Sequence, residues 1–327
     1  MFTPQSFSIA LLMVVVSTIC WGSWANTFKG VKDFRFELFY WDYAIGIFAI
    51  SLILAFTMGS VHSGPSSFLA NISVASEGDI ISALIGGAVF NLANLLLVAG
   101  IDMAGLAVAF PVSIGLALIV GVVLSYVLQP KGNPILLAGG VVLAVIAVIL
   151  DGKAYAGLRK PGAGVSRKSL WVCVVSGVLM GLWAPFVTHS MTAGRSLGPY
   201  STAVFFTLGA LLSCFIFNTY LMKRPLSGEP VAASGYFRAS AGEHLLGIAG
   251  GFVWGVGTVF NLVAASFTGV AISYAIGQAS PMVAALWGVF AWHEFRGAGT
   301  KAKTYLGLMF LFYILAIVTV AAANRVH

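Results

Sequence analysis

Ten apolar stretches, each about the length that crosses the ~30 Å hydrocarbon core of a bilayer, follow one another through this 327-residue chain. Charged residues make up 8% of the sequence and hydrophobic residues 59%, whereas a soluble domain carries about 25% charged residues. The net charge of +7 therefore indicates membrane-flanking loops and no nucleic-acid partner. We expect an all-α membrane protein with ten transmembrane helices, at residues 7–27, 38–59, 79–100, 104–128, 133–151, 169–189, 199–222, 243–264, 269–291 and 303–323.

The lysines and arginines are divided unevenly between the two sides of the predicted membrane. Fourteen of the seventeen lie in odd-numbered connections, and only Lys131, Arg195 and Arg325 lie on the other side. Because cytoplasmic loops carry the excess of Lys and Arg, both termini are expected outside. The fourteen are Lys29, Lys32, Arg35, Lys153, Arg159, Lys160, Arg167, Lys168, Lys223, Arg224, Arg238, Arg296, Lys301 and Lys303.

With five stretches in each half, the two halves must cross the membrane in opposite directions. We place an N-terminal repeat at 1–151, a cytoplasmic linker at 152–168 and a C-terminal repeat at 169–327. This is the organisation of an inverted-repeat transporter.

The halves also share residues at a constant spacing of 164 positions. The double glycines of this pattern predict close helix crossings, because small residues let membrane helices approach one another. Pro111, Pro185 and Pro281 lie inside stretches and are expected to shape their helices. The matched residues are Gly86, Gly87, Val89, Gly105 and Ala107 with Gly250, Gly251, Val253, Gly269 and Ala271.

Two short runs resemble a known group of transporters. Residues 21–26 read WGSWAN and residues 39–43 read FYWDY. With ten short stretches, a five-plus-five repeat and a cationic central loop, they resemble the drug/metabolite transporter superfamily. Within it, the chain is similar to the ureide permease and glucose/ribose porter group, which includes rhamnose–proton symporters. The resemblance implies a secondary transporter in which each half supplies four helices to a central cavity, with the fifth and tenth helices supporting the outside.

The central loop departs from one feature of plant ureide permeases, a motif similar to a phosphate-binding loop. Residues 162–169 read GAGVSRKS, with Arg167 where the pattern G-x-x-x-x-G-K-S requires glycine. We therefore interpret the loop as a solvated linker and expect no nucleotide or other cofactor.

Asp42 is the candidate proton-coupling residue. It lies inside the second stretch between two aromatic residues, with no basic residue within a helical turn, and an ionisable group in a membrane span is usually functional. The alternative is a carboxylate that stabilises the helix N-terminus. Lys29 is its candidate partner. Asp102 and Asp151, at the ends of stretches, are expected to be solvated.

Aromatic and amide side chains within the stretches are the candidate substrate-binding residues. Sugars and flat ureides are both held by an aromatic face together with hydrogen bonds from amides. The alternative is that the amides hold helices together. The set is Trp21, Trp24, Asn26, Trp41, Asn91, Asn94, Trp183, Trp254, Asn261, Tyr274 and Gln278.

These features predict proton-coupled uptake of a small, neutral, polar solute by alternating access, with a sugar first and a ureide or nucleobase-like compound next. Sodium is the alternative coupling ion, and an exporter of amphiphilic metabolites or drugs is the alternative function. A receptor or scaffold is disfavoured by the duplicated halves. We expect neither enzyme activity nor a metal site, since no nucleophile-plus-base arrangement or metal-ligand cluster is present in the sequence. The expected location is a bacterial inner membrane, as a multi-pass monomer or dimer.

Overall fold

The structure is a computed structural model that describes residues 1–32, 34–61, 67–158, 165–192 and 196–324. All regular structure in these residues is helical, and ten of the helical segments are long and apolar enough to span a membrane. The prediction of ten membrane-spanning helices is confirmed. The first span runs over Phe7–Lys29 and the last over Thr300–Ala323, within a few residues of the expected bounds.

Several spans are built from more than one helix. The elements in chain order are α1 (Phe7–Ser23), α2 (Asn26–Lys29), α3 (Phe36–Phe56), η1 (Met58–Ser60), α4 (Phe68–Val74), α5 (Glu77–Ala104), α6 (Leu106–Ala109), η2 (Phe110–Ile114), α7 (Gly115–Leu128), α8 (Pro134–Ala156), α9 (Arg167–Thr192), α10 (Pro199–Cys214), α11 (Phe217–Lys223), η3 (Ala233–Arg238), α12 (Ala241–Thr268), α13 (Val270–Gly277), α14 (Ser280–Phe290) and α15 (Thr300–Ala323).

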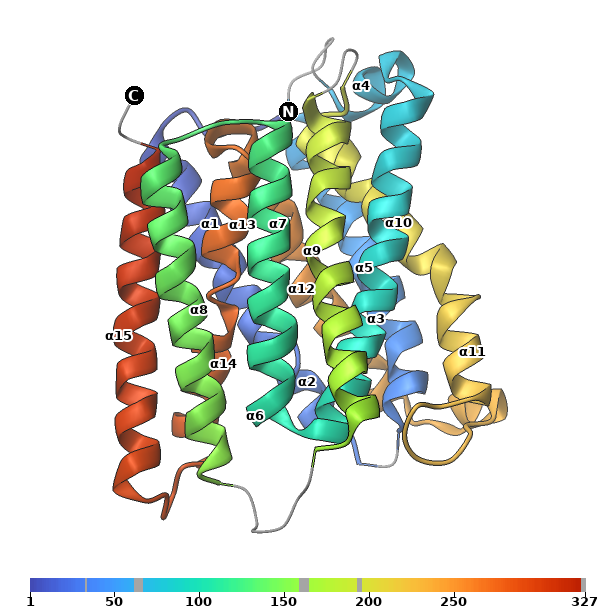
Figure 1. The fold of residues 1–327 in the computed structure, drawn as a ribbon. Helices are drawn as coiled ribbons and strands as arrows, with labels where there is room; N and C mark the ends of the chain where they lie inside the picture. The colour runs from blue at the N-terminus through green and yellow to red at the C-terminus, as the bar shows by residue number, and fades with distance from the viewer. Residues whose placement is uncertain (33, 62–66, 159–164, 193–195, 325–327) are drawn as a thin grey trace.

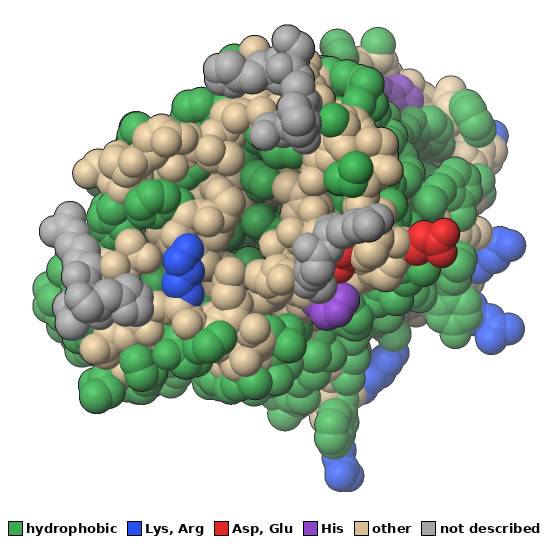
Figure 2. All heavy atoms as spheres, turned by 90° about the horizontal axis from the view of Figure 1, so that it is seen from above, with side chains coloured by type: hydrophobic (Ala, Val, Ile, Leu, Met, Phe, Trp, Pro, Cys, Tyr) green, Lys and Arg blue, Asp and Glu red, His purple; other side chains and the backbone are tan. Residues whose placement is uncertain are grey.

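The spans run side by side, and both chain ends lie at the same end of the bundle as α4 (Figure 1). We call this the terminal end, and the opposite end, which carries α2 and α6, the connection end. Helices α8 and α15, the fifth and tenth spans, pack against each other at one side of the bundle. Seen from the terminal end, the surface is mostly apolar or uncharged, with most of the blue cationic side chains at its margin (Figure 2).

Helices α5 and α12 have the same length, and their bounds are 164 positions apart. Their first and last residues match, and each is capped by a serine, Ser76 or Ser240, that accepts a hydrogen bond from the backbone N–H three residues on. Each helix ends at a glycine with positive φ, 72° at Gly105 and 87° at Gly269. Since other residues rarely adopt this backbone conformation, glycine is what permits the sharp corner at both positions.

The double glycines lie at two close helix crossings, as predicted. A Cβ added to Gly87 of α5 would lie against the Phe206 carbonyl of α10 and 2.8 Å from the Ala210 nitrogen. A Cβ added to Gly251 of α12 would lie against the Tyr43 carbonyl of α3 and 2.8 Å from the Ile47 nitrogen. The α5–α10 and α3–α12 contacts are therefore backbone against backbone, in matching registers.

Of the ten spans in the described part of the chain, five contain more than one helical segment, and in three of these the interruption borders a cavity. The first breaks between α1 and α2, the fourth passes through the π-helical η2 around Pro111, and the ninth breaks between α13 and α14, just before Pro281. Pro185, in contrast, lies inside the continuous α9. Interrupted backbone within a membrane occurs where protein or a water-filled cavity surrounds it, and these breaks surround a cavity.

Candidate functional site

A central cavity of about 410 Å³ lies between the two halves of the chain. Phe90, Trp254 and Gln278 line it near the middle of their spans, whereas Lys29 and Glu294 line it at the connection end. The side chains of Lys29 and Glu294 are 43% and 29% exposed, so this mouth reaches the protein surface. The lining residues are Trp21, Gly22, Trp24, Ala25, Asn26, Phe28, Lys29, Phe36, Phe90, Asn94, Leu97, Val98, Ile101, Leu106, Phe110, Ile114, Tyr155, Met180, Trp183, Trp254, Gln278, Ser280, Pro281, Ala284 and Glu294.

Aromatic rings form the inner wall of the cavity. Trp254 stacks on Phe90 with ring centroids 4.4 Å apart and on Trp21 at 6.0 Å. Trp183 meets Trp21 edge-on at 6.4 Å. The Trp21 indole N–H donates to the Thr258 hydroxyl at 3.1 Å, which fixes this ring. Stacked and edge-on pairs are favourable aromatic geometries, so the wall is preformed.

Unused hydrogen-bonding groups are present beside this aromatic wall. Gln278 lies at the break between α13 and α14, and its amide makes no hydrogen bond with a residue that the structure describes. The Asn94 amide donates to the Tyr40 hydroxyl at 3.2 Å, which leaves its oxygen without a donor among the described residues. Asn26, in contrast, is held by Ser23 and Trp292. Gln278 and Asn94 can therefore bind a polar solute without breaking internal bonds.

The cavity mouth carries one compact ion pair. Lys29 Nζ lies 2.5 Å from Glu294 Oε1, and the other oxygen of Glu294 accepts a hydrogen bond from the Tyr155 hydroxyl at 3.2 Å. The ammonium of Lys29 also lies 4.8 Å from the Trp292 ring centroid. In the described part of the chain, Lys29 and Glu294 are the only charged residues that line the cavity. Because their charges are opposite, the lining is neutral overall.

The structure brings together seven of the eleven predicted binding residues: Trp21, Trp24, Asn26, Asn94, Trp183, Trp254 and Gln278. The other four do not line the cavity and bond to neighbouring helices instead. Asn91 donates to Ser213 at 2.8 Å, Asn261 donates to the Ser273 carbonyl at 3.0 Å, and Tyr274 donates to the Met180 carbonyl at 3.0 Å. Trp41 donates to the sulfur of Met222 at 3.5 Å. Binding roles remain a prediction for all eleven.

Asp42 lies outside the cavity lining, in a small polar cluster. It is 2% exposed, accepts a hydrogen bond from the Tyr236 hydroxyl at 2.5 Å, and lies 2.7 Å from His244 Nδ1. Lys29, its expected partner, bonds to Glu294 instead. Tyr236 and His244 are far from Asp42 in the sequence. The fold places them beside it, because η3 and the start of α12 pack near α3.

A sequence comparison assigns the chain to a family. The sequence profile described as Ureide permease matches residues 39–159 and 169–323. The chain belongs to the ureide permease family. Ureide permease 1 of Arabidopsis thaliana is 22% identical in an alignment that covers 87% of this chain and 88% of the relative. Ureide permease 2 of the same plant is 22% identical in an alignment that covers 99% of each chain. A chain of known crystal structure, 18% identical, matches with a TM-score of 0.64 over 98% of this chain and 100% of its own, a likeness of fold alone.

Membership in the ureide permease family, together with the ten apolar helices, makes this chain an integral multi-pass membrane protein and a transporter of small solutes. A permease family also indicates a transporter in place of an enzyme. The predicted class of protein is thus confirmed at this level.

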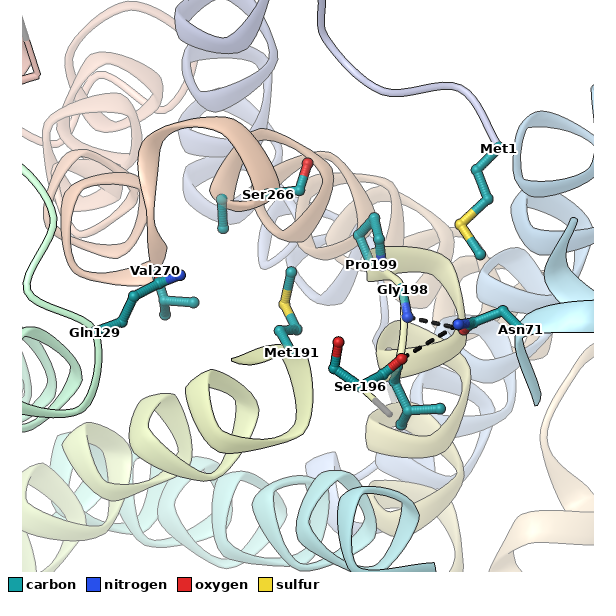
Figure 3. A pocket seen from close by; sticks show the side chains of 11 residues that line it. Met1, Asn71, Gln129, Met191, Ser196, Gly198, Pro199, Ser266 and Val270 are labelled. Carbon is teal, nitrogen blue, oxygen red and sulfur yellow. Dashed lines mark hydrogen bonds between the residues drawn. The ribbon is translucent and has the colours of Figure 1, made fainter. Parts of the chain in front are cut away.

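This ureide permease homologue has a second cavity, of about 380 Å³, at the terminal end of the bundle. Met1, Gln129, Met191 and Ser266 are among its lining residues, and it shares none with the central cavity. At its edge, Asn71 accepts a hydrogen bond from the Gly198 N–H at 2.8 Å and donates to the Ser196 carbonyl at 3.3 Å (Figure 3). The two cavities therefore lie toward opposite ends of the bundle.

The expectation that Asp151 is solvated is wrong. Asp151 is 1% exposed, because the last turns of α8 pack against α6, η2 and α15. The sequence analysis also missed Phe90, Tyr155 and Glu294 as cavity residues. Glu294 could have been recognised in the sequence as an acidic residue just after the ninth predicted stretch.

Proposed function

We propose that this protein takes up a small, neutral, polar solute by alternating access, with a ureide as the first candidate. The observation that carries the proposal is the neutral central cavity, in which stacked indoles adjoin the free amide groups of Gln278 and Asn94. Ligand sites of this kind are typically apolar, with a few polar groups that fix orientation.

The charges of the lining argue for a neutral solute. The carboxylate of Glu294 and the ammonium of Lys29 neutralise one another at the mouth, so neither is free to balance a charged substrate. Deeper in the cavity, the lining residues that the structure describes are uncharged: aromatic, apolar and amide side chains together with the hydroxyl of Ser280. The sequence alone favoured a sugar. Family membership favours a ureide instead. A ureide presents a flat array of amide groups, which can stack on the ring faces of the wall and form hydrogen bonds with the polar groups beside them.

The pairing of helices supports the inverted repeat that alternating access requires. Helices α5 and α12 share bounds, caps and glycine corners at one spacing, and the crossings at Gly87 and Gly251 are built alike. With the cation-rich connections in the cytoplasm, the central cavity faces inward and the second cavity faces outward. We propose an inward-facing arrangement in a cell membrane, an inner membrane if the cell is bacterial.

Proton coupling remains part of the proposal, with sodium as the alternative ion. Asp42 was the first candidate, and its contact with His244 gives it a partner that can also exchange a proton. Export of amphiphilic compounds is less well supported, because the one acid among the described lining residues, Glu294, is paired with Lys29.

Thermal unfolding of the purified protein with allantoin, uracil, L-rhamnose and D-ribose tests the substrate class. A ligand at 100 times its Kd stabilises the folded protein by about 2.7 kcal/mol. We expect allantoin to raise the apparent melting temperature. A rise with a sugar alone would replace the ureide assignment, and no rise with any of the four would count against the whole substrate class.

A pair of asparagines on the same helix tests the site. Asn94→Ala should weaken binding of the active probe about three- to tenfold, as expected for the loss of one hydrogen bond. Asn91→Ala is the matched control, since Asn91 is equally buried but bonds to Ser213 away from the cavity. Equal binding by both variants would move the site elsewhere.

A further inference from the structure

Asp151 stands apart from the other buried acids of the described chain. Asp42 is bonded to Tyr236 and His244, and Asp79 accepts a hydrogen bond from the Ser76 hydroxyl at 2.5 Å. Both carboxyl oxygens of Asp151 are buried and have no hydrogen-bond partner among the described residues. Tyr313 of α15, 0% exposed, also has an unpartnered hydroxyl.

No described residue around Asp151 carries a positive charge that contacts its carboxyl group. The charged and titratable groups near it are the phenols of Tyr155, one turn along α8, and of Tyr313 on α15. Lys153 of α8 is exposed and its ammonium lies 5.7 Å from the Tyr305 ring centroid. The segments α6 and η2, which pack on α8, contain no charged residue. An ionised carboxylate buried without a partner costs several kcal/mol, so the neutral acid is the favoured form.

Asp151 lies directly behind the wall of the central cavity. Its neighbour Gly152 packs on the kinked fourth span, where an added Cβ would lie against Pro111 and 2.8 Å from the Ala107 carbonyl oxygen. The same kink lines the cavity with Phe110 and Ile114. One turn along α8, Tyr155 lines the cavity and bonds to Glu294 at its mouth. A movement of the kinked segment would therefore change the surroundings of the carboxyl group and the shape of the cavity together.

We propose that Asp151 is a proton-binding site of the transport cycle. In the arrangement seen here it holds the proton as a neutral acid. When α6 and η2 separate from α8 at Gly152, its O–H bond breaks, the proton passes to cavity water, and a carboxylate remains; no electron transfer is involved. The role in coupling rests on the proposed function as a transporter, whereas protonation of the side chain does not.

Infrared spectroscopy of the protein purified in a detergent without ester groups, at neutral pH, tests the protonation without any substrate. The wild type should show the carbonyl stretching band of a protonated carboxyl group. Asp151→Asn should lose this band and Asp42→Asn should keep it. Absence of the band from the wild type, or its persistence in Asp151→Asn, would overturn the proposal. Absence of the band from the wild type would refute the proposal even if the variant does not fold.

Proteoliposomes loaded with the solute that binds in the thermal assay test the coupling. In Asp151→Asn, accumulation driven by an imposed pH gradient should fall about tenfold or more, while exchange of labelled for unlabelled solute persists. Accumulation at the wild-type level would refute the coupling role. If the wild type transports none of the four probes, the proposed function fails, and the infrared result still decides whether Asp151 holds a proton.

Discussion

Replacing Gly251 with alanine tests the close packing on which the proposed repeat depends. The added methyl group would lie against the Tyr43 carbonyl oxygen, 2.8 Å from the Ile47 nitrogen and 2.9 Å from the Gly46 Cα. All three neighbours are backbone atoms, which cannot rotate away as a flexible side chain can. Helices α12 and α3 would have to separate by roughly 1 Å to restore ordinary contact distances.

The magnitude follows from overpacking. Extra methyl groups in a packed core cost about 1–3 kcal/mol, occasionally more, and a clash with rigid backbone belongs at the upper end. At ~2–4 °C per kcal/mol, we expect Gly251→Ala to melt roughly 6–12 °C below the wild type. Gly87→Ala should lose a similar amount, because its methyl group would meet the Phe206 carbonyl and the Ala210 nitrogen in the same way.

The assay is thermal unfolding of both variants beside Gly307→Ala, the matched control. Gly307 is an exposed position of α15 where an added Cβ has nothing within 4 Å. Alanine there should be neutral or stabilising by up to about 1 kcal/mol, because it favours helix more than glycine does. If Gly251→Ala melts like Gly307→Ala, the α3–α12 crossing is looser than described. If only one of Gly87 and Gly251 is sensitive, the two crossings are not equivalent.

Three further predictions concern the cavity wall, the orientation and the first candidate for coupling. Gly152→Ala should destabilise the protein by about 1–3 kcal/mol, whereas Gly139→Ala on the same helix, whose Cβ would meet only Thr319 at 3.9 Å, should not; equal melting temperatures would contradict the Gly152 contact. In intact cells, a cysteine at the exposed Val165 should resist a membrane-impermeant thiol reagent, and labelling there would reverse the orientation. Asp42→Asn should keep solute exchange but lose pH-driven accumulation if Asp42 is the coupling site, and unchanged accumulation would remove it from consideration.

The spans could be predicted from the sequence because membrane insertion depends on local properties. An apolar stretch of about 20 residues satisfies its own backbone as a helix whatever surrounds it. Prolines also pointed to two of the three helix breaks that border the cavity, at Pro111 and Pro281. The break after α1 carries no proline and could not be found in this way.

The residues of the cavity were harder to predict, because the direction a side chain faces depends on which helices lie beside it. Asn91 and Asn94 are three residues apart on α5, yet only Asn94 lines the cavity and Asn91 bonds to α10. At the end of α13, Gln278 likewise lines the cavity, whereas Tyr274 bonds to the Met180 carbonyl of α9. Composition cannot distinguish the members of such pairs, because both are polar or aromatic residues inside an apolar stretch.

The two candidate proton carriers differ in what surrounds them, and this difference decides what each can do. Asp42 has a hydroxyl and an imidazole within hydrogen-bonding distance, and these contacts hold η3 and α12 on α3. Asp151 has no such partner among the described residues, and its surroundings favour the neutral acid until the cavity wall moves. A group couples a proton to transport only if its proton affinity differs between the two states of the protein. The buried position behind the kink at Pro111 gives Asp151 that difference, because the segment that covers it also lines the cavity.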